Sequence, residues 1–282
     1  MITPALKTSR CQAQFLDVDG RRLFVLDVRP TGPVRGNLLY LPPFNEEMNR
    51  CRAPVVATAR ALAAHGWRTL LLDPTGTGES QGDITDAHWG IWLKDAVGAA
   101  RWLVATSVGE SNRITVWGLR TGALLAAEVA AAWPEGIQRL LFWQPVLDGS
   151  LFLTQQLRLR IASQMVHARE KESTEMLKQR LAAGEAIEVA GYPLTGMMAD
   201  ALNMLRLSNF SLARHPLTWI EVAGTERSLS PVSQKFLAAH SAAGGTAVAE
   251  AVSGSMPWQV HGREDALELR ETTVRLLTQA AS

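Results

Sequence analysis

The chain of 282 residues is predicted to be an α/β protein, with a mostly parallel central sheet and helices on both faces. Strand-like and helix-like segments alternate in the first half of the chain and again near its end. The strand-like runs are apolar throughout, as expected for strands that are buried on both faces. A helical stretch at residues 148–215 interrupts the alternation, and this length exceeds that of an ordinary connection.

The first half opens with a predicted hairpin. Residues 13–18 and 22–28 are strand-like and flank Asp19 and Gly20, a pair typical of two-residue hairpin turns. The strand that follows ends at two prolines, which lack the N–H that a sheet ladder requires. This strand is predicted at 36–44. Further strands are predicted at 67–73, 113–118 and 139–146, and helices at 49–66, 86–106 and 121–133.

The second half contains the predicted insert and the return to alternation. Within the insert, the apolar spacing predicts helices at 152–166, 173–184 and 196–207, with a strand-like piece at 185–194. Strands at 217–224 and 246–254 and helices at 231–244 and 263–280 follow. We therefore predict a core of residues 1–147 and 216–282, and a helical cap of residues 148–215 over a pocket at the carboxyl ends of the strands.

Composition excludes several classes of function. The 28 Lys and Arg residues balance 27 Asp and Glu, with no block of like charge, so we expect neither a nucleic-acid partner nor an anionic membrane surface. The most apolar helix, at 123–133, contains Glu128 and is far shorter than the roughly 20 residues that span a bilayer. Two cysteines and the absence of an apolar leader predict the cytoplasm. No metal-ligand spacing or cofactor motif is present, so we expect neither a metal nor a cofactor.

The most informative stretch is VWGLRTGALLA, at residues 116–126, where a strand passes directly into a helix. Gly118 and Gly122 flank Arg120 at a distance of two residues on each side. Small residues at these positions are required where a sharp turn crowds a helix against a strand, as in the Gly-x-Ser-x-Gly nucleophile elbow. Here the central residue is an arginine.

The order of elements resembles the α/β-hydrolase fold over essentially the whole chain, with a cap after the sixth strand. More narrowly, the chain resembles the exosortase A system-associated hydrolase 2 family, whose members are encoded near PEP-CTERM protein-sorting and exopolysaccharide genes in Gram-negative bacteria. This resemblance implies a hydrolase-type site and a candidate protein partner from that system. It is carried by residues 41–52, 117–134, 140–162 and 180–195.

Arg120 cannot act as the nucleophile, because a guanidinium has five donors, no acceptor, and a permanent charge. The helix N-terminus behind it favours negative charge. The resemblance implies an oxyanion hole from the N–H of Thr121 and that of Phe44 or Asn45, since Pro42 and Pro43 have none. Together these groups would suit an anionic ligand. In the alternative interpretation, Glu46 or Glu47, expected in the same loop, forms an internal ion pair with Arg120.

The acid and the histidine that the resemblance leads us to expect are both displaced. Arg227 occupies the position expected for the acid, and Glu226 directly precedes it. Trp258 occupies a position where the histidine is expected, and His261 lies three residues further along the chain. Glu226 and His261 are the candidate acid and base. The candidate ligand-binding residues are Phe44, Asn45, Glu46, Thr121 and Trp258.

Three hypotheses follow. The chain binds an anionic small molecule or acyl-type ligand, or a partner, under the cap without standard serine hydrolysis. Alternatively, it hydrolyses an ester, thioester or acyl group with water activated by His261 and Glu226. The third is a non-catalytic scaffold of the PEP-CTERM and exopolysaccharide pathway that docks through apolar cap helices.

Overall fold

The structure is a computed structural model that describes residues 9–107, 112–164, 172–224, 227–259 and 265–279. Within these residues the main sheet has eight strands, in the order β1-β2-β4-β3-β5-β6-β9-β10. The pairs β1/β2 and β2/β4 are antiparallel and the others are parallel. The strands are β1 (Ser9–Val18), β2 (Arg21–Pro30), β3 (Gly36–Leu41), β4 (Trp67–Leu72), β5 (Ile114–Leu119), β6 (Ile137–Trp143), β9 (Leu217–Val222) and β10 (Ala247–Val252).

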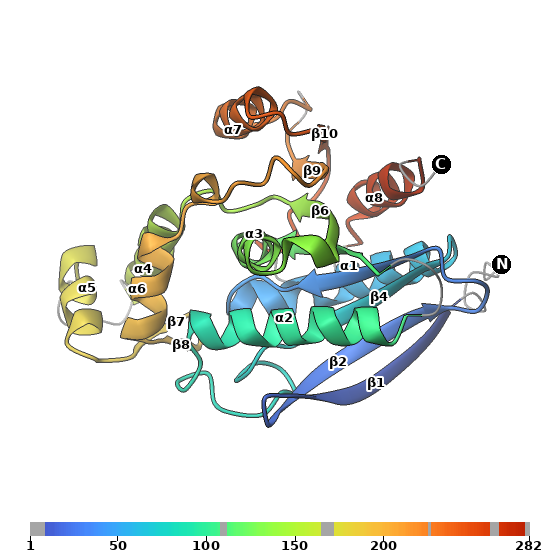
Figure 1. The fold of residues 1–282 in the computed structure, drawn as a ribbon. Coiled ribbons are helices and arrows are strands. Elements are labelled where there is room, and N and C mark those ends of the chain that lie inside the picture. The colour runs from blue at the N-terminus through green and yellow to red at the C-terminus, as the bar shows by residue number, and fades with distance from the viewer. Residues whose placement is uncertain (1–8, 108–111, 165–171, 225–226, 260–264, 280–282) are drawn as a thin grey trace.

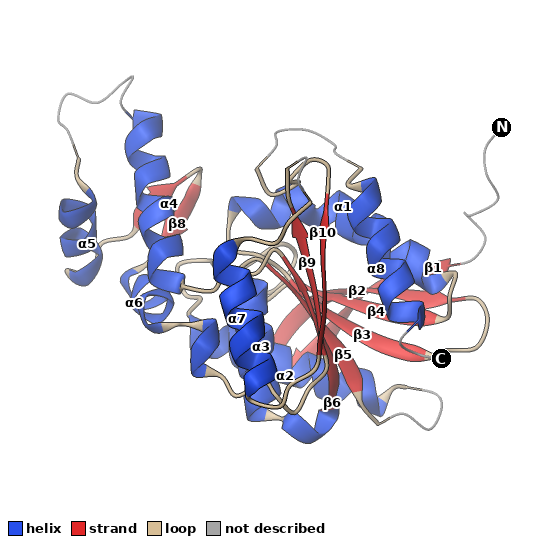
Figure 2. Cartoon of the chain, turned by 90° about the horizontal axis from the view of Figure 1, so that it is seen from above, coloured by secondary structure: helices blue, strands red, loops and turns tan. Residues whose placement is uncertain are grey.

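Helices cover both faces of this sheet, as the continuous apolar strands predicted (Figure 1). One apolar core joins α2 and α3 to the sheet, and a second joins α1 and α8 to its other face (Figure 2). The helices of the core are α1 (Glu46–Ala63), α2 (Trp89–Ala105), α3 (Gly122–Ala132), α7 (Pro231–Ala242) and α8 (Leu267–Gln279), with a short 3-10 turn η2 (Pro134–Gly136).

The predicted hairpin is confirmed. Val18 pairs with Arg21, and Asp19 and Gly20 form the turn with φ of +52° and +77°. Two successive residues with positive φ give the twist that a two-residue hairpin requires, which explains the Asp-Gly pair.

The segment between β6 and β9 forms a separate group of elements at one side of the sheet (Figure 1). At its base the entering and leaving chains pair, because Asp148 forms an isolated bridge with Arg206 and an ion pair of 2.8 Å. The division of the chain at residues 148–215 stays a prediction. The elements are α4 (Gly149–Gln164), α5 (Thr174–Ala182), the hairpin β7 (Ile187–Val189) and β8 (Tyr192–Leu194), α6 (Gly196–Met204) and the 3-10 turn η3 (Leu207–Asn209).

One boundary differs from the sequence-based prediction in a way that affects the site. The helix predicted from residue 49 begins at Glu46, so Glu46 and Glu47 lie in the first turn of α1 and not in a loop. Acidic residues favour a first helical turn, because its free N–H groups carry partial positive charge. Among the described residues, no helix is both long and apolar enough to cross a membrane.

Candidate functional site

The centre of the candidate site is the turn between β5 and α3. Arg120 is its central residue and has a φ of +55°. This left-handed conformation costs a non-glycine residue about 1–2 kcal/mol. It is held by the Arg120 N–H, which donates to the carbonyl of Trp143 at 3.0 Å, and by the Arg120 carbonyl, which accepts from the N–H of Val146 at 3.1 Å. The backbone of β6 and of the segment after it therefore fixes the strained residue.

The two flanking glycines are required by the close approach of backbone atoms. A Cβ on Gly122 would lie 2.2 Å from the carbonyl oxygen of Leu41, and one on Gly118 would lie 2.5 Å from Cα of Ala123. Neither of these neighbours is a side chain that could rotate away. The Gly-x-x-x-Gly spacing thus has the steric cause that the sequence predicted.

The loop after β3 packs against this turn. Its Phe44 is buried, and its ring contacts the rings of Trp92 at 5.8 Å and Phe152 at 6.4 Å. Trp92 belongs to α2 and Phe152 to α4, so Phe44 joins the core to the segment between β6 and β9. Sequence reasoning placed Phe44 in this loop but missed both ring contacts, which depend on distant residues.

Arg120 forms an ion pair with Glu47. Its Nε and Nη2 donate to the two carboxylate oxygens at 3.2 and 3.3 Å, and the side chains are 16% and 14% exposed. The ring of Trp258 lies 5.7 Å from the guanidinium carbon, within the range of a cation–π contact. A carboxylate and an aromatic ring therefore hold the guanidinium in place.

The pair is not an ideal one. Its two hydrogen bonds are longer than the roughly 2.7–2.9 Å of strong charge-assisted bonds. Burial raises the pKa of the Glu47 carboxyl, and the opposing effect of Arg120 offsets this only in part. Loss of water around the carboxylate thus outweighs the attraction of the guanidinium.

The neighbouring Glu46 does not contact Arg120. It forms an ion pair with Arg50 one helical turn later, and Nη1 of Arg50 donates to the carbonyl of Trp258 at 3.3 Å. Arg50 therefore connects α1 to the loop that carries Trp258. Sequence reasoning missed Arg50, although the i,i+4 spacing from Glu46 would have indicated the pair had the helix start been placed at Glu46.

Asn45 lies between the loop and α1 and is 8% exposed, with a φ of +52°. Neither Oδ1 nor Nδ2 of its amide has a hydrogen-bond partner among the described residues. A buried polar group without a partner costs about 1–3 kcal/mol. Thr121, which follows Arg120, is buried at the N-cap of α3, and its hydroxyl does not cap the helix.

The remaining site predictions concern the last two loops of the core. Glu226 and His261 lie outside the described residues. Arg227 forms an ion pair with Glu268 of α8 at 2.8 Å. Trp258 is buried beside Arg120. Of the predicted site residues, the structure thus brings Arg120 and Trp258 into direct contact, with Thr121 next in the chain.

One further contact near the site links α1 to the hairpin β7–β8. Asn49 lies in α1, two residues after Glu47, and its Nδ2 donates to the hydroxyl of Tyr192. No motif in the sequence indicated this pair. Among the described residues, no group of three or more His, Cys, Asp or Glu side chains is placed to hold a metal ion.

Comparison with known proteins decides the fold. No family model matches the chain, and no curated protein matches its sequence. Solved structures do match over nearly the full length. Est1E from Butyrivibrio proteoclasticus, bound to ferulic acid, is 18% identical with a TM-score of 0.65, and the match covers 95% of this chain and 96% of Est1E. The alpha/beta hydrolase domain-containing protein 10 from mouse is 14% identical, with a TM-score of 0.58 and coverage of 95% and 98%.

The chain has the α/β-hydrolase fold. A thioesterase domain from the curacin biosynthetic pathway matches as well, with 17% identity, a TM-score of 0.56 and coverage of 96% of this chain and 99% of that domain. At such identities the likeness concerns the α/β-hydrolase fold alone. The chemistry of the site depends on the residues described above.

Proposed function

We propose that this protein binds an acyl-type ligand at the elbow of its α/β-hydrolase fold and does not hydrolyse it. In this fold the turn after the central strand carries the nucleophile. The turn between β5 and α3 corresponds to that elbow, and we infer that Arg120 stands in place of the nucleophilic serine. The ion pair of Arg120 with Glu47 is the observation that carries the proposal.

Neither residue at the elbow supports a covalent mechanism. A guanidinium has no lone pair to attack a carbonyl carbon. The hydroxyl of Thr121 belongs to a buried side chain at the start of α3. For comparison, loss of the nucleophile from an unrelated serine protease lowers turnover by about 10⁶.

The geometry favours a carbonyl ligand over a strongly anionic one. Glu47 already neutralises Arg120, so a second carboxylate would meet a pair without net charge. The pair uses Nε and Nη2, and no hydrogen bond within the described residues uses Nη1. The partnerless amide of Asn45 offers a donor and an acceptor on the adjoining loop. A carbonyl oxygen with a neighbouring N–H would match these groups.

The test compares three probes of equal chain length: hexanamide, methyl hexanoate and hexanoate. We expect hexanamide to raise the melting temperature most, because it has both a carbonyl oxygen and an N–H. At about a hundredfold above Kd, a ligand that binds only the folded state adds about 2.7 kcal/mol of stability. Methyl hexanoate is then incubated with the protein and its hydrolysis followed by mass spectrometry.

Two variants and one control complete the test. Arg120→Met and Asn45→Gly should each remove the stabilisation by hexanamide, whereas Arg275→Met should not, because Arg275 of α8 forms its ion pair with Glu250 of β10. Stabilisation that is equal in all proteins would overturn the proposal. So would hydrolysis of methyl hexanoate that is lost in His261→Ala, a result that would establish the water-activating hydrolase instead.

A specific observation also favours a scaffold function. In the described part of the chain, several large apolar side chains are exposed on the helices between β6 and β9, including Leu151, Met197 and Met204, which is 74% exposed. We propose that these helices dock a protein of the exosortase and exopolysaccharide system, the partner class that the family resemblance suggests. The cytoplasm is the proposed compartment, and two free cysteines support it. Serine substitutions at the three positions should weaken binding to a purified partner without changing stability.

A further inference from the structure

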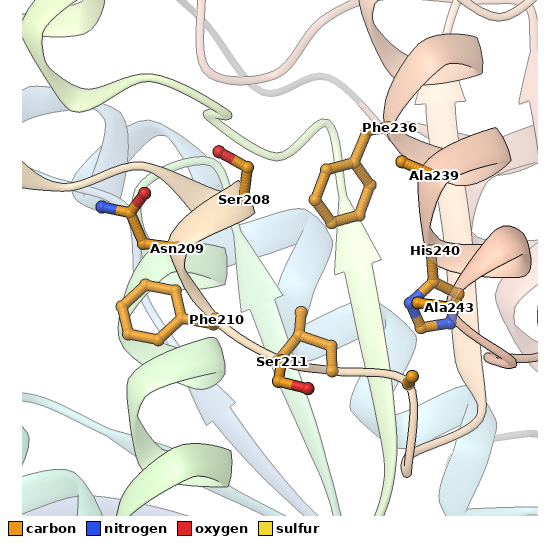
Figure 3. A pocket seen from close by; sticks show the side chains of 10 residues that line it. Ser208, Asn209, Phe210, Ser211, Phe236, Ala239, His240 and Ala243 are labelled. Atoms are coloured by element: carbon orange, nitrogen blue, oxygen red, sulfur yellow. The ribbon is translucent and has the colours of Figure 1, made fainter.

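A groove lies at the opposite end of the parallel strands from the elbow. It is a groove of about 310 Å³ between α7 and the segment that leads from η3 toward β9 (Figure 3). The groove lies near the amino ends of β9 and β10, since its lining residues precede Leu217 and Ala247. The elbow, in contrast, follows the carboxyl end of β5. The volume is at the lower end of the range for small-molecule sites, about 300–1,000 Å³.

The walls of the groove are aromatic. Phe236 stacks on the buried Trp219 with a centroid distance of 5.4 Å and an interplanar angle of 29°. On the same helix, the ring of His240 lies nearly parallel to that of Phe236, at 15° and 6.5 Å. Phe210 lies on the other side of the groove, on the segment after η3 (Figure 3). Parallel, fixed rings on one wall favour a flat ligand, because aromatic rings attract one another in offset-stacked arrangements beyond the gain from apolar burial.

His240 contributes a polar ring to this wall. Nε2 of the buried His240 lies 3.4 Å from the carbonyl oxygen of Thr246. The tautomer that satisfies this carbonyl carries its proton on Nε2, which makes Nδ1 an acceptor. No hydrogen bond in the described residues uses Nδ1. A ligand donor could therefore bind it.

The groove carries no charge of its own. None of the described side chains that line it is an acid, a lysine or an arginine, and the polar ones other than His240 are Ser208, Asn209 and Ser211. A charged ligand would lose its hydration on entering the groove and would find no opposite charge there, which is unfavourable. A neutral ligand with one or two polar groups fits this lining.

We propose that the groove between α7 and the segment after η3 is a binding site for a small neutral phenol. The aromatic ring would stack against Phe236, and its hydroxyl would donate to Nδ1 of His240 in the plane of the imidazole ring. This site is independent of the acyl-type ligand proposed at the elbow, because it shares no residue with it.

The test uses p-cresol, with toluene and 4-methylcyclohexanol as matched probes. Toluene lacks the hydroxyl, and 4-methylcyclohexanol has the hydroxyl on a ring that cannot stack. Binding is followed by saturation-transfer NMR and by chemical-shift changes of the histidine ring protons. We expect p-cresol to bind the wild type about fivefold more tightly than either analogue, which corresponds to about 1 kcal/mol, since each analogue lacks either the hydrogen bond or the stacked ring.

Variants on α7 separate the groove from the rest of the surface. Ala239→Leu should fill the groove and weaken p-cresol binding at least tenfold. Ala238 is the adjacent exposed residue outside the groove, and Ala238→Leu should change the affinity for p-cresol by less than twofold. His240→Phe keeps a ring but removes the acceptor. It should lower the affinity for p-cresol to that for toluene and leave toluene binding unchanged. Circular dichroism confirms that each variant is folded.

Two results would overturn this proposal. One is the absence of saturation transfer to p-cresol at millimolar concentration in the wild type. The other is unchanged p-cresol binding in Ala239→Leu and in a second wall variant, Phe210→Ala. Arg120→Met should bind p-cresol as the wild type does, so failure of the elbow proposal is distinguishable from failure here.

Discussion

Arg120, which follows the last residue of β5, is joined to Glu47 in the first turn of α1 by two hydrogen bonds of 3.2 and 3.3 Å. The two residues are 73 positions apart in the chain. Their contact lies at the turn between β5 and α3, and the α/β-hydrolase fold carries its reactive side chain at a turn of this kind. The consequences of this pair for stability are testable without knowledge of the ligand.

Glu47→Gln should lose less stability relative to the wild type at pH 8 than at pH 5. Burial raises the pKa of Glu47 in the folded chain above its ordinary value of 4.5. A carboxyl with a raised pKa contributes stability that is complete below its unfolded pKa and is lost as the pH rises through the folded pKa. Glutamine is neutral at every pH and avoids this loss. Urea denaturation at pH 5 and pH 8 should show the variant gaining on the wild type as the pH rises.

Glu250→Gln is the matched control for that experiment. Glu250 pairs with Arg275, but both side chains are much more exposed than those of the Arg120–Glu47 pair. Loss of such a surface pair should cost at most about 1 kcal/mol. A deficit of Glu47→Gln relative to the wild type that grows from pH 5 to pH 8 would contradict the raised pKa.

Arg120→Met should be destabilising. Without the guanidinium, the Glu47 carboxylate is buried with no countercharge, and breaking such a pair costs about 3 kcal/mol at pH 7. The double variant Arg120→Met/Glu47→Gln should recover most of this loss, because no buried charge remains. Unfolding free energies of the four proteins form a double-mutant cycle. Additive effects in this cycle would show that the two side chains do not interact.

Gly122→Ala should destabilise the elbow strongly. The new methyl group would lie 2.2 Å from the carbonyl oxygen of Leu41 and 2.7 Å from that of Pro42. Since both atoms belong to backbone, we expect a loss of about 3 kcal/mol, at the upper end for overpacking. Gly32→Ala meets no atom within 4 Å and should be nearly neutral. Equal melting temperatures for the two variants would contradict the close packing at the elbow.

Phe44→Ala tests the connection between the core and the segment between β6 and β9. The ring contacts of Phe44 with Trp92 and Phe152 would be lost, at a cost of about 3–5 kcal/mol. Amide hydrogen exchange of α4, which carries Phe152, should accelerate. Phe15→Ala removes a ring that is 48% exposed and should leave α4 exchange unchanged. If α4 exchange is also unchanged in Phe44→Ala, Phe44 does not hold this segment.

The architecture was predictable because it depends on local patterns. Each signal depends only on residues close in the sequence: the apolar strands, the intervening helices and the Asp19–Gly20 turn. Together they indicate a parallel sheet covered on both faces. The spacing of Gly118 and Gly122 likewise predicted the tight turn, since its cause is steric crowding within a few residues.

The partners within the site were harder to predict, because they depend on distant residues and on one helix boundary. The sequence indicated that Glu46 or Glu47 could reach Arg120, and only the observed start of α1 at Glu46 shows which one does. The helical period places Glu46 beside Arg50, with which it forms an ion pair, and Glu47 is the residue that pairs with Arg120. The contact of Trp258 with Arg120 and the link from Asn49 to Tyr192 have no signature in the sequence.

The most direct test of the central claim, that the elbow holds a fixed cation and no nucleophile, is labelling by a fluorophosphonate followed by intact-protein mass spectrometry. Such probes form a covalent bond with an activated serine or threonine hydroxyl. Our account predicts an unchanged mass after prolonged incubation. A single stoichiometric adduct that is lost in Thr121→Val would contradict it, because it would show a reactive hydroxyl beside Arg120.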